Sequence, residues 1–245
     1  MQRLGHTRSS SQADHALWTP DTFVRAPLPA MKNATAVVHA APAMGASFTE
    51  YTVEFEAGGC LGPAITQRFV YVLDGELQFE AGKKLHRLKK DGYVYVPPGM
   101  KHSVSAPGAS RAVVIEKAYQ RANGMPAPKL LVGDEVRVPG RPLMGDEALQ
   151  VRTLLPIDFA FDCAVNTMTF EPGATLPVVE IHMMEHGLLM LEGGGIYRLG
   201  DSWYPVTAGD FIWMGPYCPQ WFGALGKVPA KYLIYKDWNR HPLAE

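Results

Sequence analysis

Four side chains that can bind a metal ion or move a proton stand within seven residues of the sequence. They are Glu180, His182, Glu185 and His186, in the stretch "VVEIHMMEHGLLMLEGGG" that covers 178–195. Because successive residues of a strand face opposite sides, we expect Glu180, His182 and His186 to share one face and Glu185 to face away. If that face is the apolar interior of a small β-barrel, unpaired carboxylate and imidazole groups there would destabilise the fold. A metal ion bound by all three would remove this penalty.

A carboxylate with two histidines can bind manganese, iron, nickel or zinc, and the spacing alone does not choose among them. We expect a fourth ligand from a neighbouring strand, and Gln220, which follows the "GPYCP" turn, is the candidate. An amide oxygen is a hard ligand, so the set favours manganese over zinc or copper. The alternative interpretation is that both histidines are surface residues, or hydrogen-bonded core residues, without a metal.

The elements that must position these residues are predicted to be strands. Runs rich in Val, Tyr, Phe and Ile alternate with Gly, Pro and Asp turns along the chain, as in "RFVYVLDGELQFE" and "GLLMLEGGGIYRL". No long amphipathic helix pattern competes with them. The sequence therefore predicts an all-β fold.

The same order of strands and turns occurs twice. "VLDGEL" (72–77) precedes "MLEGGG" (190–195) by 118 positions, and "YVYVPPGMKH" (93–102) precedes "FIWMGPYCPQ" (211–220) by the same offset. Upstream, "FEAGG" and "FEPGA" are 115 positions apart, so the second copy has three extra residues just before "LLMLEG". The shared offset indicates a tandem duplication of a small double-sheet barrel or jelly roll.

The duplication divides the chain into four parts. We expect an N-terminal arm (1–45), a first barrel (46–119), a linker rich in Pro and Gly (120–150) and a second barrel (151–245).

The first copy is an internal control for the metal site. The positions that match Glu180, His182, His186 and Gln220 hold Gly62, Ala64, Arg68 and His102. Because the ligand set is missing there, the first barrel is predicted to be metal-free and structural. His102 is interpreted as a core or loop histidine.

Composition limits the partners and the location. The chain has 245 residues, of which 47% are hydrophobic and 19% charged, and its net charge is −1. The sequence has no dense Lys/Arg cluster of the kind that binds nucleic acid. It also has no apolar run long enough to predict a membrane span. Three cysteines without a C-x-x-C pair indicate reduced thiols. We therefore expect a cytoplasmic protein with a small-molecule substrate, and the many Trp residues and the N-terminal arm favour a homo-oligomer.

Several motifs together are similar to those of one family. The stretches "EIHMMEHG", "LEGGGIY", "GDFIWMG" and "YLIYKDWNR", with "WTPD" and "MGASFTEYTVEF" upstream, resemble the bicupin (S)-ureidoglycine aminohydrolases of purine (allantoin) breakdown over nearly the whole chain. The resemblance implies a bicupin fold, with two tandem double-stranded β-helix (jelly-roll) barrels. It also implies manganese-dependent hydrolysis of (S)-ureidoglycine to (S)-ureidoglycolate and ammonia.

The resemblance also implies roles for single residues. It assigns Glu180, His182, His186 and Gln220 to one Mn²⁺ ion in the second barrel, and Tyr197, Tyr232 and Lys236 to the substrate pocket, with Tyr197 and Lys236 taking part in catalysis. Considered alone, aromatic residues on barrel strands predict packing, and a Lys near a strand end predicts a solvated side chain. Two departures from the family pattern, the third Gly of "LEGGG" and the stretch "PYCPQW", affect the fit of the substrate rather than the metal set.

Two other functions share the same fold and ligand types. One is a different metal-dependent bicupin, such as a dioxygenase or decarboxylase acting on a small organic acid. The other is a non-catalytic cupin that binds a small ligand. Oxygen consumption or carbon dioxide release without ammonia would indicate the first, and metal binding without turnover the second.

Overall fold

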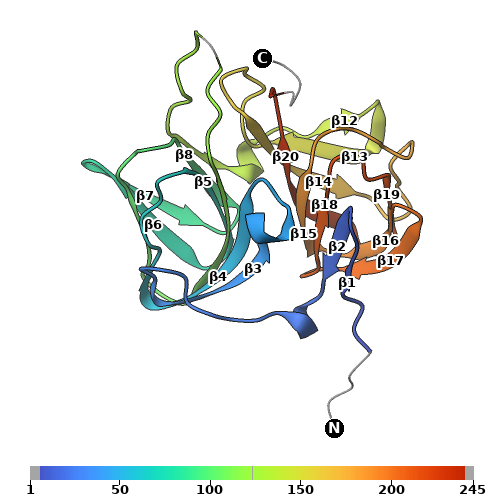
Figure 1. Cartoon of the computed structure of the whole chain (residues 1–245), viewed down its shortest axis with the longest axis horizontal. Helices are drawn as coiled ribbons and strands as arrows, with labels where there is room; N and C mark the ends of the chain where they lie inside the picture. The colour runs from blue at the N-terminus through green and yellow to red at the C-terminus, as the bar shows by residue number, and fades with distance from the viewer. Residues whose placement is uncertain (1–5, 123, 241–245) are drawn as a thin grey trace. The chain divides into compact units, whose positions relative to one another are not determined.

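The chain folds almost entirely into β-strands, as predicted. The structure is a computed structural model that describes residues 6–122 and 124–240 (Figure 1). Within those residues it has strands and three short 3₁₀ turns, Pro20–Thr22, Pro42–Met44 and Glu135–Arg137, and no α-helix. The same residues include no helix with the length and hydropathy needed to cross a bilayer.

The chain divides into two compact units. Unit 1 comprises the described residues of Met1–Phe23, Pro139–Ile157 and Cys163–Glu245, and unit 2 comprises those of Val24–Val138 and Asp158–Asp162. These boundaries cut across the ranges expected from the sequence, because strand pairing assigns parts of the expected arm and linker to the barrels. The segment His15–Trp18 pairs with Phe211–Met214 of unit 1. The segments Lys32–Ala40 and Leu131–Asp134 pair with strands of unit 2.

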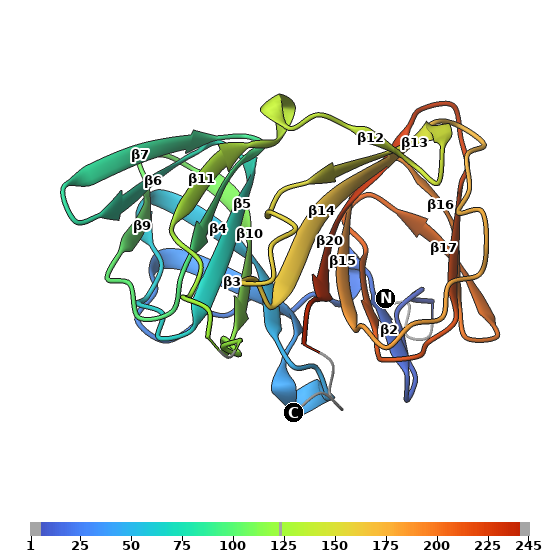
Figure 2. The ribbon, with the colours of Figure 1, turned by 90° about the horizontal axis from the view of Figure 1, so that it is seen from above.

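Unit 1 is a barrel of two sheets. Its strands are β1 (Ser10–Ser11), β2 (His15–Trp18), β12 (Arg141–Leu143), β13 (Asp146–Thr153), β14 (Cys163–Phe170), β15 (His186–Glu192), β16 (Gly194–Leu199), β17 (Ser202–Thr207), β18 (Phe211–Met214), β19 (Gln220–Ala224) and β20 (Ala230–Asp237). The larger sheet has the order β1-β2-β18-β15-β20-β14-β13-β12, and the smaller one β17-β16-β19. Figure 2 shows the β16–β17 hairpin opposite β14, β20 and β15.

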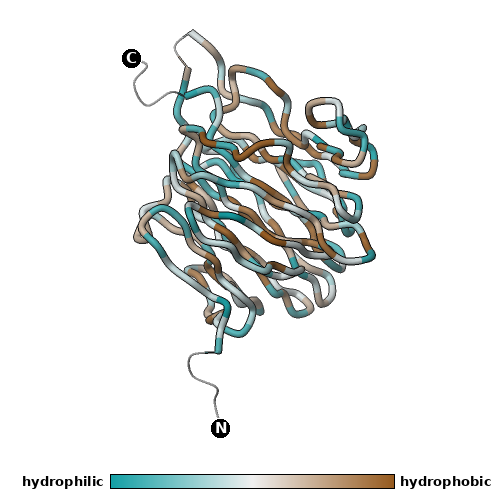
Figure 3. Tube along the Cα trace, turned by 90° about the vertical axis from the view of Figure 1, so that its right-hand side faces the viewer, coloured by the Kyte–Doolittle hydropathy of each residue, from teal (hydrophilic) through white to brown (hydrophobic). Residues whose placement is uncertain are grey.

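The core of unit 1 lies between its two sheets. Phe170 and Tyr232 from the larger sheet and Phe222 from the smaller one belong to the same buried cluster. The ring of Phe222 packs edge-on against Phe170, with centroids 4.9 Å apart. Burial of such large aromatic side chains contributes strongly to folding, roughly 25 cal/mol for each Å² of apolar area. In Figure 3, hydrophobic and hydrophilic positions alternate along many strands, as this one-sided burial requires.

Unit 2 repeats the same strand order. Its strands are β3 (Lys32–Ala40), β4 (Thr49–Cys60), β5 (Gln67–Asp74), β6 (Glu76–Ala81), β7 (Lys84–Lys89), β8 (Gly92–Val96), β9 (Ser103–Ala106), β10 (Ser110–Lys117) and β11 (Leu131–Asp134). They form one sheet of order β11-β8-β5-β10-β4-β9-β6-β7, with β3 also on β4. The run β8-β5-β10-β4 matches β18-β15-β20-β14 of unit 1, so the duplication read from the sequence is present in the topology.

The three glycines of "LEGGG" are needed for close backbone approach at the start of β16. Gly193 has a φ of +62°, which L side chains rarely adopt. A Cβ at Gly195 would lie 2.1 Å from the carbonyl oxygen of Gly223 on the neighbouring strand β19. The third glycine of "LEGGG", which departs from the family pattern, therefore allows β16 to pack closely against β19. Strand β19 begins with Gln220.

Candidate active site

One cavity of unit 1 is lined by all seven residues that the sequence analysis assigned to the metal or to the substrate pocket. It has a volume of about 90 Å³, roughly that of three water molecules in the liquid. Its polar lining is Asn166, Glu180, His182, His186, Tyr197, Gln220, Tyr232 and Lys236. Its apolar lining is Leu143, Val151, Met168, Leu176 and Ile234. It is a small, mostly buried space with several polar groups in its wall.

The prediction that 180–186 is a continuous strand was wrong, although Glu180, His182 and His186 do line one cavity. Glu180 forms an isolated bridge with Gln220: each backbone N–H donates to the other's carbonyl oxygen, at 2.8 and 2.9 Å. The chain then leaves the sheet, and the His182 carbonyl accepts from the Tyr217 N–H at 2.8 Å. His186 is the first residue of β15. Pairing with β19, rather than strand alternation, therefore sets the position of Glu180.

The metal-binding atoms of these residues converge. The Nε2 atoms of His182 and His186 are 3.2 Å apart, and the Gln220 Nε2 is 2.9 Å from the His182 Nε2. A Glu180 oxygen lies 3.9 Å from the same His182 nitrogen. A half-turn of the Gln220 carboxamide would place its oxygen where its nitrogen lies. Two imidazoles, a carboxylate and an amide oxygen form a donor set suited to a divalent cation, so these residues fit the metal that the fold implies.

Electrostatics at the cavity keep His186 neutral. Burial lowers its pKa well below the ordinary value of 6.5, and the nearby His182 and Lys236 lower it further. A neutral imidazole has a lone pair to give to a metal, whereas an imidazolium has none. The low pKa therefore suits the role of a ligand.

The residues expected in the substrate pocket come from β16 and β20. Lys236 lies opposite His186 across the β15–β20 pair, and its Nζ is 5.0 Å from the ring centroid of Trp238. Burial lowers the pKa of Lys236 below 10.5, while Glu180 acts in the opposite direction. Tyr197 donates to the Gln220 Oε1 at 3.3 Å, and Tyr232 donates to the Met168 sulfur at 3.3 Å.

Two further residues of this region need separate description. Glu185 does not line the cavity, but it is buried rather than solvated, at 3% exposure, and its carboxylate accepts from the Trp213 Nε1 at 3.4 Å. Asn166 lines the cavity and was missed. The available signal was a polar residue in phase with Met168 and Phe170 on a core-facing strand.

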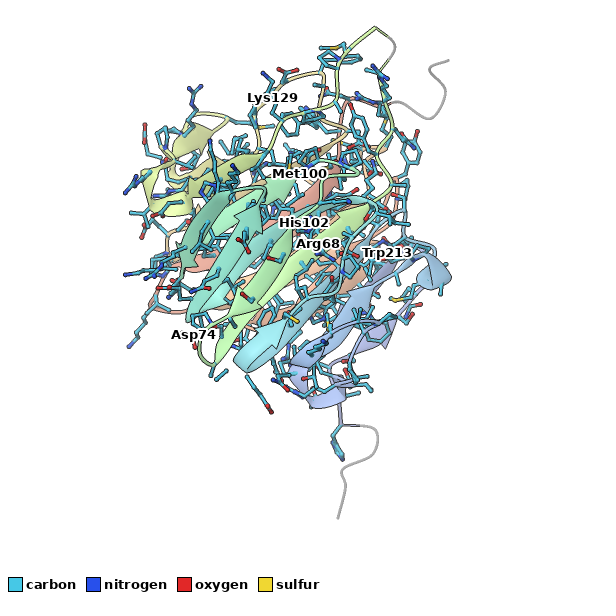
Figure 4. The ribbon with its side chains drawn as sticks, turned by 90° about the vertical axis from the view of Figure 1, so that its left-hand side faces the viewer. Arg68, Asp74, Met100, His102, Lys129 and Trp213 are labelled. Carbon is cyan, nitrogen blue, oxygen red and sulfur yellow. The ribbon has the colours of Figure 1, made fainter. Side chains whose placement is uncertain are left out.

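In unit 2 a guanidinium occupies the region that matches the metal site. Arg68 is 4% exposed and donates to the Glu116 Oε1 at 2.7 Å, to the Gly62 carbonyl at 3.0 Å and to the His102 Nε2 at 3.0 Å. Gly62 and His102 are the positions that match Glu180 and Gln220. Figure 4 labels Arg68 and His102 on neighbouring parts of unit 2. The side chain thus supplies a positive charge where the second barrel gathers metal-binding groups.

Another group of potential ligands lies in unit 1. One donor atom each from Asp14, His15 and Cys218 lies within 4.8 Å of the others. Both ring nitrogens of His15 already have partners, Asp14 at 2.8 Å and the Tyr204 hydroxyl at 2.9 Å. Hydrogen bonding therefore accounts for this histidine without a metal. Cys60, Cys163 and Cys218 are reduced thiols, as expected.

Comparison with known proteins places this architecture in a class. The family model described as "Cupin domain" matches residues 51–116 and 166–235, one region in each unit. The crystal structure of the Escherichia coli protein Ylba has a TM-score of 0.86 at 29% identity, with 98% of this chain and 97% of that chain covered. The chain is therefore a cupin with two barrels, which confirms the expected bicupin fold.

Curated relatives narrow the class to one family. The (S)-ureidoglycine aminohydrolase of Arabidopsis thaliana is 41% identical over 242 residues, 98% of this chain and 80% of that protein. The enzyme of the same name from Escherichia coli K12 is 33% identical, covering 92% of this chain and 88% of that protein. The chain belongs to the (S)-ureidoglycine aminohydrolase family. Oxalate decarboxylase of Bacillus subtilis, with Mn(II) centres, shares the fold at a TM-score of 0.73 and 11% identity over 96% of this chain and 80% of that chain.

Proposed function

We propose that this chain hydrolyses (S)-ureidoglycine to (S)-ureidoglycolate and ammonia, with one manganese ion held by Glu180, His182, His186 and Gln220. The observation that carries the proposal is the placement of a partly buried lysine beside this converging donor set, in a chain whose relatives are named for that reaction. The proposed partner is the small-molecule substrate, and we propose a cytoplasmic homo-oligomer.

Lys236 is the proposed anchor for the substrate carboxylate. Its ammonium is the cationic side chain of the cavity lining, and it lies on the wall next to His186. A charge-assisted hydrogen bond in a buried site is stronger than one in water. With the carboxylate fixed there and the metal-binding residues on another wall, the amine and the ureido group on the same carbon face different residues, so the cavity distinguishes the two enantiomers.

The two tyrosines act as hydrogen-bond donors in this proposal. Burial raises the pKa of Tyr197 and of Tyr232 far above the ordinary value of 10.0. Both phenols therefore remain protonated at neutral pH and can donate to a substrate oxygen. The same shift makes them poor general bases, so their role is to orient the substrate.

A bound divalent cation supplies Lewis-acid chemistry in such a site, and the oxygen ligands from Glu180 and Gln220 favour manganese over softer metals. In the overall reaction a C–O bond to the water oxygen replaces the C–N bond to the amine. The amine takes up a proton and leaves as ammonia. The apolar residues Leu143 and Val151 in the cavity wall limit access of further water.

The test is ammonia release from freshly prepared (S)-ureidoglycine, with enzyme stripped of metal and then resupplied with manganese. The spontaneous rate is subtracted, and His182→Ala and His186→Ala serve as metal-site variants. We expect manganese-dependent release that yields the (S) product, and both variants should lose bound metal and activity together. Metal binding without ammonia release would reject the proposed substrate. Oxygen uptake or carbon dioxide release would then indicate a dioxygenase or a decarboxylase.

A further inference from the structure

Asn166 is a polar residue of the cavity wall that the proposed function leaves without a role. It lies on β14 and is 6% exposed. Its Oδ1 is enclosed, and none of the residues that the structure describes donates a hydrogen bond to it. Such a group needs an explanation, because buried polar atoms in proteins nearly always have a partner.

The unpaired oxygen of Asn166 lowers the stability of the protein when the cavity holds no ligand. An unsatisfied buried carbonyl destabilises the folded state, because it has lost the water that solvates it in the unfolded chain. The neighbours of Asn166 on the same face are Met168, two residues along β14, and its two cross-strand partners, Ile234 on β20 and Thr153 on β13. Met168 and Ile234 have no strong donor, and the hydroxyl of Thr153 does not donate to the Asn166 Oδ1. A molecule that enters the cavity can therefore supply the missing donor.

The register of β14 and β20 places Asn166 close to Lys236. Asn166 pairs with Ile234, and Lys236 lies two residues further along β20 on the same face. Diagonal neighbours of this kind are about 7–8 Å apart, within reach of one small molecule. A substrate with its carboxylate on Lys236 can therefore bring a second substituent of the same carbon to Asn166.

We infer that Asn166 binds the ureido group of the substrate and selects acids that carry this group. The inference rests on the proposed function. A carboxamide has one acceptor and two donor hydrogens, and a ureido group offers the complementary N–H donors and carbonyl acceptor. A short turn of the Asn166 side chain about its terminal torsion, which has a broad energy well, lets oxygen and nitrogen meet these partners.

The test compares two ligands that cannot react because they lack the amine. N-carbamoylglycine carries a ureido group, and N-acetylglycine has a methyl group in place of its terminal NH₂. Their dissociation constants are measured by calorimetry on the manganese-loaded protein. We expect the wild type to prefer N-carbamoylglycine by about 10-fold, the value of one buried hydrogen bond. In Asn166→Leu this ratio should fall to about one.

Ile234→Val is the matched control, because it changes the same wall of the cavity at a side chain that makes no hydrogen bond. It should keep the wild-type ratio. Asn166→Leu should retain its manganese and should unfold at no lower temperature than the wild type, since an apolar side chain of similar size replaces an unpaired amide. Asn166→Ala provides the same comparison if the leucine variant does not fold.

Two results would overturn the inference. One is a wild type with equal affinity for both ligands, and the other is an Asn166 variant that keeps the wild-type preference. Ammonia release by the wild type separates this failure from failure of the proposed function. Release with an unchanged preference rejects Asn166 alone, whereas no release and no binding of either ligand rejects both.

Discussion

The surroundings of Lys236 determine whether its side chain is solvated or lines the cavity. Near the end of a strand a lysine is normally solvated, yet here the strand end lies over the cavity and the side chain is largely enclosed. Its ammonium lies 5.0 Å from the ring centroid of Trp238, and the charge of Glu180 opposes the effect of burial on its pKa. A lysine kept charged in such a place is suited to binding an anion.

Lys236→Met should therefore raise KM and leave the bound manganese in place. Loss of a charge-assisted hydrogen bond costs about 1.5–3 kcal/mol, so kcat/KM should fall by about 10- to 100-fold. Steady-state kinetics and metal analysis of the same preparation measure both effects. Lys231→Met, on the same strand but outside the cavity, is the control. Normal turnover by Lys236→Met at low substrate would reject the carboxylate anchor.

At this scale the sequence was sufficient for some residues and not for others. The grouping of Glu180, His182, His186 and Gln220 could be predicted, because their residue types and the duplication offset both point to one site. Asn166 could not, because a single polar residue in a strand gives no sign of whether its neighbours will satisfy it. Only its surroundings in the folded chain, Met168, Ile234 and Thr153, show that no neighbour donates to its Oδ1.

Strands β16 and β19 show how an element can control the site at a distance. The third glycine of "LEGGG", Gly195, allows the β16 backbone to approach Gly223 on β19, and β19 begins with Gln220. The same strand holds Glu180 through the bridge to Gln220. A change in the β16–β19 distance would therefore move two of the proposed ligands together.

Gly195→Ala should separate these two strands. The added Cβ meets backbone rather than a flexible side chain, so we expect a loss of about 1–3 kcal/mol in the free energy of unfolding, together with weaker manganese binding. Gly108→Ala is the control, since a Cβ there meets nothing within 4 Å. Urea unfolding and metal titration check the result. A Gly195 variant as stable as the control would contradict the close approach.

The strands themselves were predictable, because alternating apolar residues and turn residues mark nearly all of them. The segment 180–186 was not, since its in-phase polar residues look like a strand although the chain forms a loop there. Pairing across the sheet, between Glu180 and Gln220, overrides the local pattern. Strands of the barrels also lie within the expected arm and linker, because a short strand such as β2 can pair with either copy and the sequence does not say which.

At the scale of the whole molecule, the two units can be observed separately. All five Trp residues, at 18, 203, 213, 221 and 238, belong to unit 1. Tryptophan fluorescence therefore reports on the unit with the proposed metal site. Amide hydrogen exchange of β5 and β10 reports on unit 2.

Removal of manganese by a chelator should lower the unfolding midpoint seen by tryptophan fluorescence. A ligand present at about 100 times its Kd stabilises the folded state by about 2.7 kcal/mol, and this contribution is lost with the metal. Exchange in β5 and β10 should not change. His186→Ala should show no shift on chelation, and a shift of wild-type size in that variant would place the metal elsewhere.

Unit 2 should lose stability as the pH falls. The His102 Nδ1 donates to the Met100 carbonyl at 2.8 Å, so its Nε2 accepts from Arg68. Burial lowers the pKa of His102 below the ordinary 6.5, and Arg68 lowers it further. The unfolded chain then takes up the proton first, so this contribution to stability is present above about pH 6.5 and is lost as the pH falls through the lowered pKa.

Replacement of His102 should remove this contribution. Hydrogen exchange of β5 and β10 between about pH 7 and pH 5 should accelerate less in His102→Gln than in the wild type, after correction for the intrinsic rate. Glutamine still accepts a hydrogen bond from Arg68 but does not titrate. Identical pH profiles for the two proteins would show that His102 does not titrate in this range.

Arg68 gives the first barrel a cation that cannot dissociate, because it is part of the chain. Under the proposed function, the second barrel must take its cation from solution, so its occupancy follows the supply of metal in the cell. One half of the chain is then complete as soon as it folds, and the other only after it has captured an ion. When manganese is scarce, newly made chains would therefore accumulate with one finished barrel and one inactive barrel that a later supply of metal can switch on.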